Sequence, residues 1–157
     1  MQVITFKAKP KTLFGIVLAL TGIIVIVLTF TGNHLGKEVN GKSQIPCATA
    51  EERNAYLTSL GYTFEEPPEE KEITIPEEFS QVYVDYNDIQ KQQGFDLTPY
   101  KGKTATIYKY TITNYKDDAH IIADLLVENG VLIGADLCNP DAENGFLVAL
   151  TKNDGTN

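Results

Sequence analysis

The chain has 157 residues, with 13 Lys and Arg against 21 Asp and Glu, and a formal net charge of −8. This length allows one modest domain, and a hydrophobic fraction of 43% with 7 Phe and 8 Tyr argues against a disordered chain. The acidic balance argues against nucleic acid as a partner, because phosphates attract a face of Lys and Arg. Two cysteines are too few for a disulfide-rich mini-protein.

Residues 12–32 contain no charged side chain, and every charge of the chain lies outside this segment. As a helix rising about 1.5 Å per residue, the segment would extend roughly 31 Å, which matches the hydrocarbon core of a bilayer. We therefore expect a transmembrane helix. The alternative is a cleaved signal, which would make the protein a secreted or lipoprotein-like factor. Signal peptides normally have a shorter apolar region and a small-x-small cleavage site, and the QIPC around Cys47 matches a lipoprotein site poorly.

Lysines flank this span unequally, and their distribution predicts its orientation. Lys7, Lys9 and Lys11 precede the span closely, whereas Lys37 and Lys42 follow it at a greater distance. Because the cytoplasmic flank of a membrane helix carries more Lys and Arg, we expect the N-terminus in the cytoplasm. The chain after residue 33 has 10 basic and 21 acidic residues, a net charge of −11, so no cluster of basic residues holds it on the cytoplasmic side.

The expected organisation has four parts in chain order. They are a cytoplasmic stub at 1–11, a transmembrane helix at 12–32, a flexible tether at 33–46 and an extracytoplasmic domain at 47–157. The tether is rich in Gly, Asn, Lys and Ser and has no apolar period. The protein is thus expected to be a single-pass membrane protein that contacts the lipid bilayer through its N-terminal helix.

Two helices are expected in the outer domain. Thr49 and Glu52 have the spacing of a capping box, and Gly61 is a natural stop for the helix that they begin. Pro76 is expected to open the second helix, where a missing N–H costs nothing. Its apolar and aromatic residues follow at helical spacing until Gly94.

Beyond the second helix the hydrophobic period changes from helical to two. Strands are expected at 72–75, 104–114, 120–128, 131–137 and 146–150. Asn129-Gly130 is a strong signal for a tight hairpin turn, after which Val131, Ile133, Ala135 and Leu137 should share one face. The expected class is α+β: a mainly antiparallel meander sheet with two helices packed on one face.

Cys47 and Cys138 are the two cysteines, and an extracytoplasmic location favours a disulfide between them. Such a bond would join the start of the first helix to the end of a central strand. Two separate buried thiols are the alternative. No CxxC motif is present, so thiol catalysis is not expected.

The sequence offers no catalytic, cofactor-binding or metal-ligating set. Its two histidines and the absence of G-x-S-x-G and H-E-x-x-H motifs argue against hydrolase triads and zinc sites. Asp124 and Asp136 fall on the strand faces opposite the apolar positions, so we expect them on a water-facing sheet surface. No cofactor is expected.

Several longer strings carry a family resemblance. ERNAYLTSLGY, ITIPEEFSQVYVDYNDIQKQQGFDLTPYKGK, YKYTITNY and VLIGADLCNPDAENGF together cover about residues 50–150. The chain resembles the uncharacterised bacterial family called domain of unknown function 4830, which has Gly where this chain has Ala135. The resemblance implies a short protein with an N-terminal span and one outer domain. It implies no activity, substrate or catalytic residue.

The sequence is most consistent with a membrane-anchored protein whose outer domain binds an envelope protein or a cell-wall component. Phe95 and Tyr100 lie near a turn and are the candidate interaction surface, because loops on a rigid scaffold often carry function. The alternative in which they cover the core stays open. A cell-envelope hydrolase that uses paired carboxylates is a second hypothesis, and it requires buried acids in a concave site.

Overall fold

The computed structural model describes residues 38–39, 42–115, 120–141 and 145–153. The chain divides into two compact units, Met1–Ser43 and Gln44–Asn157. The expected stub at 1–11 and span at 12–32 lie outside the described residues. Among the residues that the structure does describe, no helix combines the length and apolar character that a bilayer crossing requires. In the first unit, strand β1 (Glu38–Val39) pairs antiparallel with β2 (Lys42–Ser43), within the region expected to be a flexible tether.

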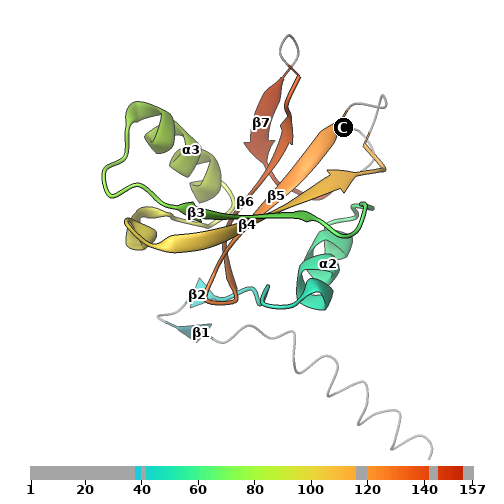
Figure 1. The fold of residues 1–157 in the computed structure, drawn as a ribbon, viewed down its shortest axis with the longest axis horizontal. Coiled ribbons are helices and arrows are strands. Elements are labelled where there is room, and N and C mark those ends of the chain that lie inside the picture. Colours follow the sequence, from blue (N-terminus) through green and yellow to red (C-terminus); the bar gives the residue numbers. More distant parts are fainter. Residues whose placement is uncertain (1–37, 40–41, 116–119, 142–144, 154–157) are drawn as a thin grey trace, which may run out of the picture. The chain divides into compact units, whose positions relative to one another are not determined.

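The second unit contains a five-stranded antiparallel sheet and two α-helices, which confirms the α+β class (Figure 1). The strands follow the chain order β3-β4-β5-β6-β7, so the sheet is a simple meander. Its strands are β3 (Glu69–Thr74), β4 (Thr104–Ile112), β5 (Ile121–Glu128), β6 (Val131–Asn139) and β7 (Phe146–Ala149). The helices are α2 (Ala50–Ser59), α3 (Gln81–Lys91) and the short 3-10 helix η1 (Thr98–Tyr100).

Helix α2 begins with the expected capping box. The Thr49 side chain accepts a hydrogen bond from the Glu52 backbone N–H, and the Glu52 carboxylate accepts one in return from the Thr49 N–H at 3.1 Å. One turn in, the buried Arg53 donates to the carbonyls of Cys47 and Ala48 and to the Tyr110 hydroxyl. Arg53 therefore links the chain before α2 to the sheet. The oxygens that accept its hydrogen bonds are all uncharged.

Helix α3 begins later than the sequence predicts. It starts at Gln81 rather than at Pro76, because the Ser80 side chain caps it by accepting from the Tyr83 N–H. Pro76 lies between β3 and the helix, in the stretch where Ile75 pairs its backbone with Lys103 and Gly102. Gly94 follows the helix with φ +84°, a left-handed conformation that glycine adopts without strain.

The β5–β6 hairpin turns at Asn129 and Gly130 as expected, with φ +50° and +77°. An irregularity follows at once: Val127 pairs with Leu132, whereas Leu126 pairs with Gly134. The extra residue, Ile133, therefore changes sides. The prediction that Ile133 shares a face with its odd-numbered neighbours on β6 is wrong, because one bulged residue reverses the alternation.

The sheet is covered on both faces, so the expectation of helices on one face is wrong. On one face α2 contributes Leu57 to a buried cluster with residues of β4, β5 and β6. On the other face, Leu126 and Ile133 pack with Leu97 and with aromatic residues from and before α3. Figure 1 shows the two helices on opposite sides of the strands. The strands β5 and β6 are buried almost throughout.

The outer edge of β6 is completed by three different pieces of the chain. Near its start, the carbonyl of Ile45 accepts from Leu132 N, and further along β7 pairs with Asp136–Asn139. Between these two segments, side-chain amides of α3 and of the residues after it form hydrogen bonds with the backbone of β6. Gln90 Oε1 accepts from Ala135 N at 2.8 Å, and Gln93 Nε2 donates to Ala135 O at 2.7 Å. Gln93 Oε1 also accepts from Leu150 N at 3.1 Å.

We expect Gln93→Ala to lower the free energy of unfolding by about 1–3 kcal/mol, because it leaves the Ala135 carbonyl and the Leu150 N–H unpaired. Urea unfolding followed by tyrosine fluorescence measures this, since the chain has no Trp. Gln92→Ala, at the exposed neighbouring position, is the matched control and should change stability by less than about 0.5 kcal/mol. Equal effects of the two substitutions would contradict the edge role of Gln93.

Candidate functional site

A row of charged side chains crosses the sheet on the face that α3 covers. Direct pairing places Glu69 of β3 opposite Lys109 of β4, Lys109 opposite Asp124 of β5, and Asp124 opposite Asp136 of β6. The expectation of a water-facing surface is wrong for the two aspartates, which are 6% and 1% exposed. The reason is that the second face of the sheet is also packed, by α3.

Asp124 forms an ion pair with the cation beside it. Lys109 Nζ lies 3.1 and 3.3 Å from the two oxygens of the Asp124 carboxylate. Burial raises the pKa of Asp124, and Lys109 opposes that rise. The Lys109 side chain is 28% exposed, so the pair reaches solvent through the lysine.

Asp136 is the most deeply buried acid of the row. Tyr86 of α3 donates its hydroxyl to Asp136 Oδ2 at 2.8 Å, while Asp136 Oδ1 has no hydrogen-bond partner among the residues that the structure describes. Burial, and then the negative charge of Asp124, raise the pKa of Asp136 to about 7, although Tyr86 and Lys109 act in the opposite direction. A carboxyl in such a setting holds a proton near neutral pH.

Cys138 lies two residues beyond Asp136 on β6 and therefore on the same face. One oxygen of each aspartate and Cys138 Sγ all lie within 4.8 Å of one another. Burial raises the pKa of the Cys138 thiol to about 11, with Asp124 and Asp136 adding to the rise. The sequence gives only a weak signal for this group, because Asp124 lies on a different strand from Asp136 and Cys138 and the three form no contiguous motif.

The expected disulfide between Cys47 and Cys138 does not form, and both residues are free thiols. The Cys47 N–H donates to the carbonyl of Gly130, just before β6, whereas Cys138 lies near the far end of that strand. Eight residues of extended chain correspond to roughly 25 Å, and a disulfide needs Cα atoms within about 7 Å. Burial raises the pKa of the Cys47 thiol to about 12, so this thiol is not a reactive nucleophile.

Phe95 and Tyr100, the candidate interaction surface, are not brought together by the fold. Both are half-buried, and they pack against different clusters: Phe95 against the cluster that contains Leu57, and Tyr100 against the one that contains Leu97. Lys103 Nζ lies 5.0 Å from the centre of the Tyr100 ring. Both aromatic residues therefore cover core, which is the alternative that the sequence left open.

A groove with a volume of about 430 Å³ lies beside the edge strand β7. Three aromatic rings and the exposed side chain of Val148 contribute to its wall, and none of the described residues that line it is a carboxylate. Its lining residues are Tyr62, Gln92, Tyr115, Leu137, Phe146, Val148, Ala149 and Thr151. Its size falls within the usual range of ligand-binding clefts. The sequence signal for it was weak, because these residues come from five separate stretches of chain.

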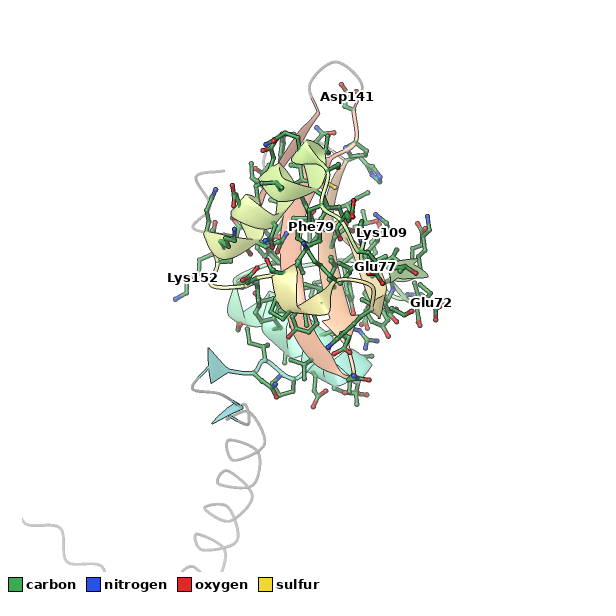
Figure 2. All side chains as sticks on the ribbon, turned by 90° about the vertical axis from the view of Figure 1, so that its left-hand side faces the viewer. Glu72, Glu77, Phe79, Lys109, Asp141 and Lys152 are labelled. Atoms are coloured by element: carbon green, nitrogen blue, oxygen red, sulfur yellow. The ribbon has the colours of Figure 1, made fainter. Side chains whose placement is uncertain are left out.

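The two features differ in what they can do chemically. The acid group is closed: Asp136 is 1% exposed and lies under Tyr86, so a substrate cannot reach its carboxyl. It can hold a proton or a metal ion. Asp141, which is exposed, lies at the start of the β6–β7 connection and far from Lys109, so it adds nothing to this group (Figure 2). The groove is open, its described lining residues carry no charge, and it can hold an apolar side chain.

The fold and these features define a small α+β domain on an antiparallel meander, with a buried acid group on one face and an edge groove beside its last strand. Comparison with family models identifies it further. Residues 56–137 match the family described as domain of unknown function (DUF4830), and the chain belongs to this family. No curated protein and no solved structure matches the chain.

We expect Asp136→Asn to stabilise the protein at pH 7.5 and to leave stability unchanged near pH 4. The pKa of Asp136 is about 7 in the fold and about 3.9 in the unfolded chain. The folded state therefore binds the extra proton, and wild-type stability falls as the pH rises from 4 to 7. The variant should gain on the order of 3 kcal/mol at pH 7.5.

Urea unfolding of both proteins across this range, with EDTA present, measures the difference. The other titratable groups facing Asp136 are Asp124, Lys109, Cys138 and Tyr86, and they remain in both proteins. A difference between the two proteins that does not change with pH would contradict the assignment of a buried, proton-holding carboxyl at Asp136.

Proposed function

We propose that this is a single-pass membrane-anchored protein whose α+β domain lies outside the cytoplasm and binds an extended, basic polypeptide segment along β7. The observation that carries the binding proposal is an uncharged edge strand with a groove beside it. The anchor rests on the uncharged segment 12–32 and on the lysines that precede it.

The two edges of the sheet differ sharply. The β3 edge carries Glu69, Glu70, Lys71 and Glu72, all exposed, and charges of this kind discourage pairing with another strand. The β7 edge has the sequence Phe-Leu-Val-Ala, and its Leu147 and Val148 are 42% and 44% exposed. An uncharged edge with exposed apolar side chains favours the addition of a strand from a partner.

The groove would make the binding selective for particular side chains of the added strand. Alternate side chains of an extended peptide point to the same face, so main-chain pairing with β7 would place every second side chain beside Val148. Tyr115 and Phe146, whose ring centres are 6.3 Å apart, also line the groove. Main-chain hydrogen bonds would supply affinity, and the groove would select apolar side chains.

Charge decides between a second copy of the chain and a different partner. Residues 44–157 carry 8 Lys and Arg against 20 Asp and Glu, a net charge of −12. Two such domains repel each other, whereas a basic segment is attracted to the domain. The occupant that these observations favour is therefore a polypeptide that alternates apolar and basic residues.

A labelled peptide that alternates Val and Lys should bind the full-length protein, and Val148→Lys should weaken binding at least about tenfold. The added charge repels the peptide and fills the groove. Val82→Lys is the matched control, since Val82 is 79% exposed on α3 and should leave binding unchanged. Fluorescence anisotropy measures both, with circular dichroism to confirm folding.

Three results would overturn the peptide proposal. The first is equal weakening by the two substitutions, and the second is equal binding of a peptide that alternates Val and Glu. The third is binding of soluble glycan-strand fragments that Val148→Lys abolishes while the basic peptide does not bind, which would identify a cell-wall component as the ligand.

For the anchor, we expect the full chain to stay in the membrane pellet after carbonate washing and to keep the mass of residues 1–157. Deletion of 12–32 should release it.

For the orientation, a membrane-impermeant maleimide should label Lys152→Cys in intact cells, since Lys152 is exposed and projects from the domain (Figure 2). Loss of about 30 or more N-terminal residues would support the secreted alternative, and labelling only after lysis would overturn the outside location.

The hydrolase hypothesis keeps one supporting observation, the burial of Asp124 beside Asp136, whose pKa values both rise. Neither acid lines the groove, and Asp136 is closed off by α3. A carboxylate hydrolase needs both acids in contact with substrate, so binding is the better-supported function.

A further inference from the structure

Three potential metal ligands converge from two adjacent strands under α3. Asp124 and Asp136 are directly paired across β5 and β6, and Cys138 is the next residue of β6 on that face. Their ligand atoms lie within 4.8 Å of one another, and two of the three residues are buried. Because the three come from adjacent strands of one ladder, the sheet itself fixes their separation.

A second observation, the surroundings of the Asp136 carboxyl, also points to a ligand at this group. Asp136 is 1% exposed, and its Oδ1 has no hydrogen-bond partner within the described part of the chain, although its Oδ2 accepts from Tyr86. A buried carboxylate oxygen without a partner is costly, since nothing replaces the water it has lost. The cost disappears when the oxygen binds a metal ion or carries a proton.

The mixture of ligands selects the kind of metal. A thiolate beside two carboxylates suits a borderline-soft divalent ion such as Zn²⁺, whereas Ca²⁺ and Mg²⁺ prefer oxygen alone. Binding releases the protons of Asp136 and Cys138 to solvent. The charges then balance, because two carboxylates and a thiolate carry −3, and a divalent ion with Lys109 carries +3. Lys109 is 28% exposed, so it can move aside while remaining near Asp124.

We propose that Asp124, Asp136 and Cys138 form a binding site for a borderline-soft divalent cation, for which Zn²⁺ is the best match. A tetrahedral Zn²⁺ holds oxygen and sulfur ligands roughly 3.4–3.6 Å apart, so ligand atoms at the 4.8 Å limit would have to close by up to about 1.4 Å. Tyr86 orients Asp136 by donating to its other oxygen, as partners of metal-bound carboxylates commonly do. A water would complete the four ligands.

The test uses the purified full-length chain, stripped with EDTA and kept reduced, and titrated with Co²⁺ as a spectroscopic substitute for Zn²⁺. We expect one ion per chain, a near-ultraviolet charge-transfer band from a cobalt–thiolate bond and visible bands of tetrahedral cobalt. Zn²⁺ should displace the cobalt and abolish these bands.

The two cysteines provide a matched pair of variants. Cys138→Ser should remove the charge-transfer band, whereas Cys47→Ala should keep it, because Cys47 lies near Gly130 at the other end of β6. Asp136→Asn should weaken Zn²⁺ binding at least about tenfold in equilibrium dialysis, with circular dichroism confirming that each variant folds. Asp136 and Cys138 are thus tested by independent readouts.

Failure of the proposal has a clear form. Absence of stoichiometric binding, a band that survives Cys138→Ser, or a band lost equally in Cys47→Ala would overturn it. Absence of stoichiometric binding would mean that a bound proton alone stabilises the buried Asp136 carboxyl. None of these outcomes depends on whether β7 binds a peptide, so this proposal stands apart from the proposed function.

Discussion

The burial of β5 and β6 on both faces is the constraint on which the rest of this structure depends. A meander with one packed face could send its polar side chains to water, but here α2 and α3 cover opposite faces. Every polar residue on the α3 side must therefore find a partner inside the protein. Asp124 finds Lys109, Asp136 finds Tyr86 with one oxygen only, and the unusual chemistry of this domain follows from that requirement.

The same constraint explains why α3 is held by amide side chains. Strand β7 is short and leaves part of the β6 edge without a strand partner, yet backbone groups there are buried and need hydrogen bonds. Gln90 and Gln93 supply both a donor and acceptors, in the manner of a neighbouring peptide group. Because these glutamines also fix the end of α3, the helix that closes the acid group is positioned by the hydrogen-bonding demand of the sheet edge.

Local signals predicted the features that depend on a few neighbouring residues, such as the Thr49 capping box and the Asn129-Gly130 turn. Features set by tertiary packing were missed. Asp124 was expected to face water because it lies on the strand face opposite the apolar odd-numbered residues. That face also carries the apolar residues Ile122 and Leu126, and apolar residues on both faces are typical of a strand that is buried on both sides. The Cys47–Cys138 pairing failed because the sequence does not show that Cys47 docks beside the start of β6, whereas Cys138 lies near the end of that strand.

The strand β6 also separates the two candidate features by the thickness of the sheet. Asp136 and Cys138 point toward α3, whereas Leu137 between them belongs to the opposite cluster and lines the groove. A ligand in the groove therefore contacts Leu137 and meets the backbone of β6 before it could meet a carboxylate. For this geometric reason the acids cannot act on a groove ligand without a rearrangement of the sheet, and recognition at β7 does not require them as catalysts.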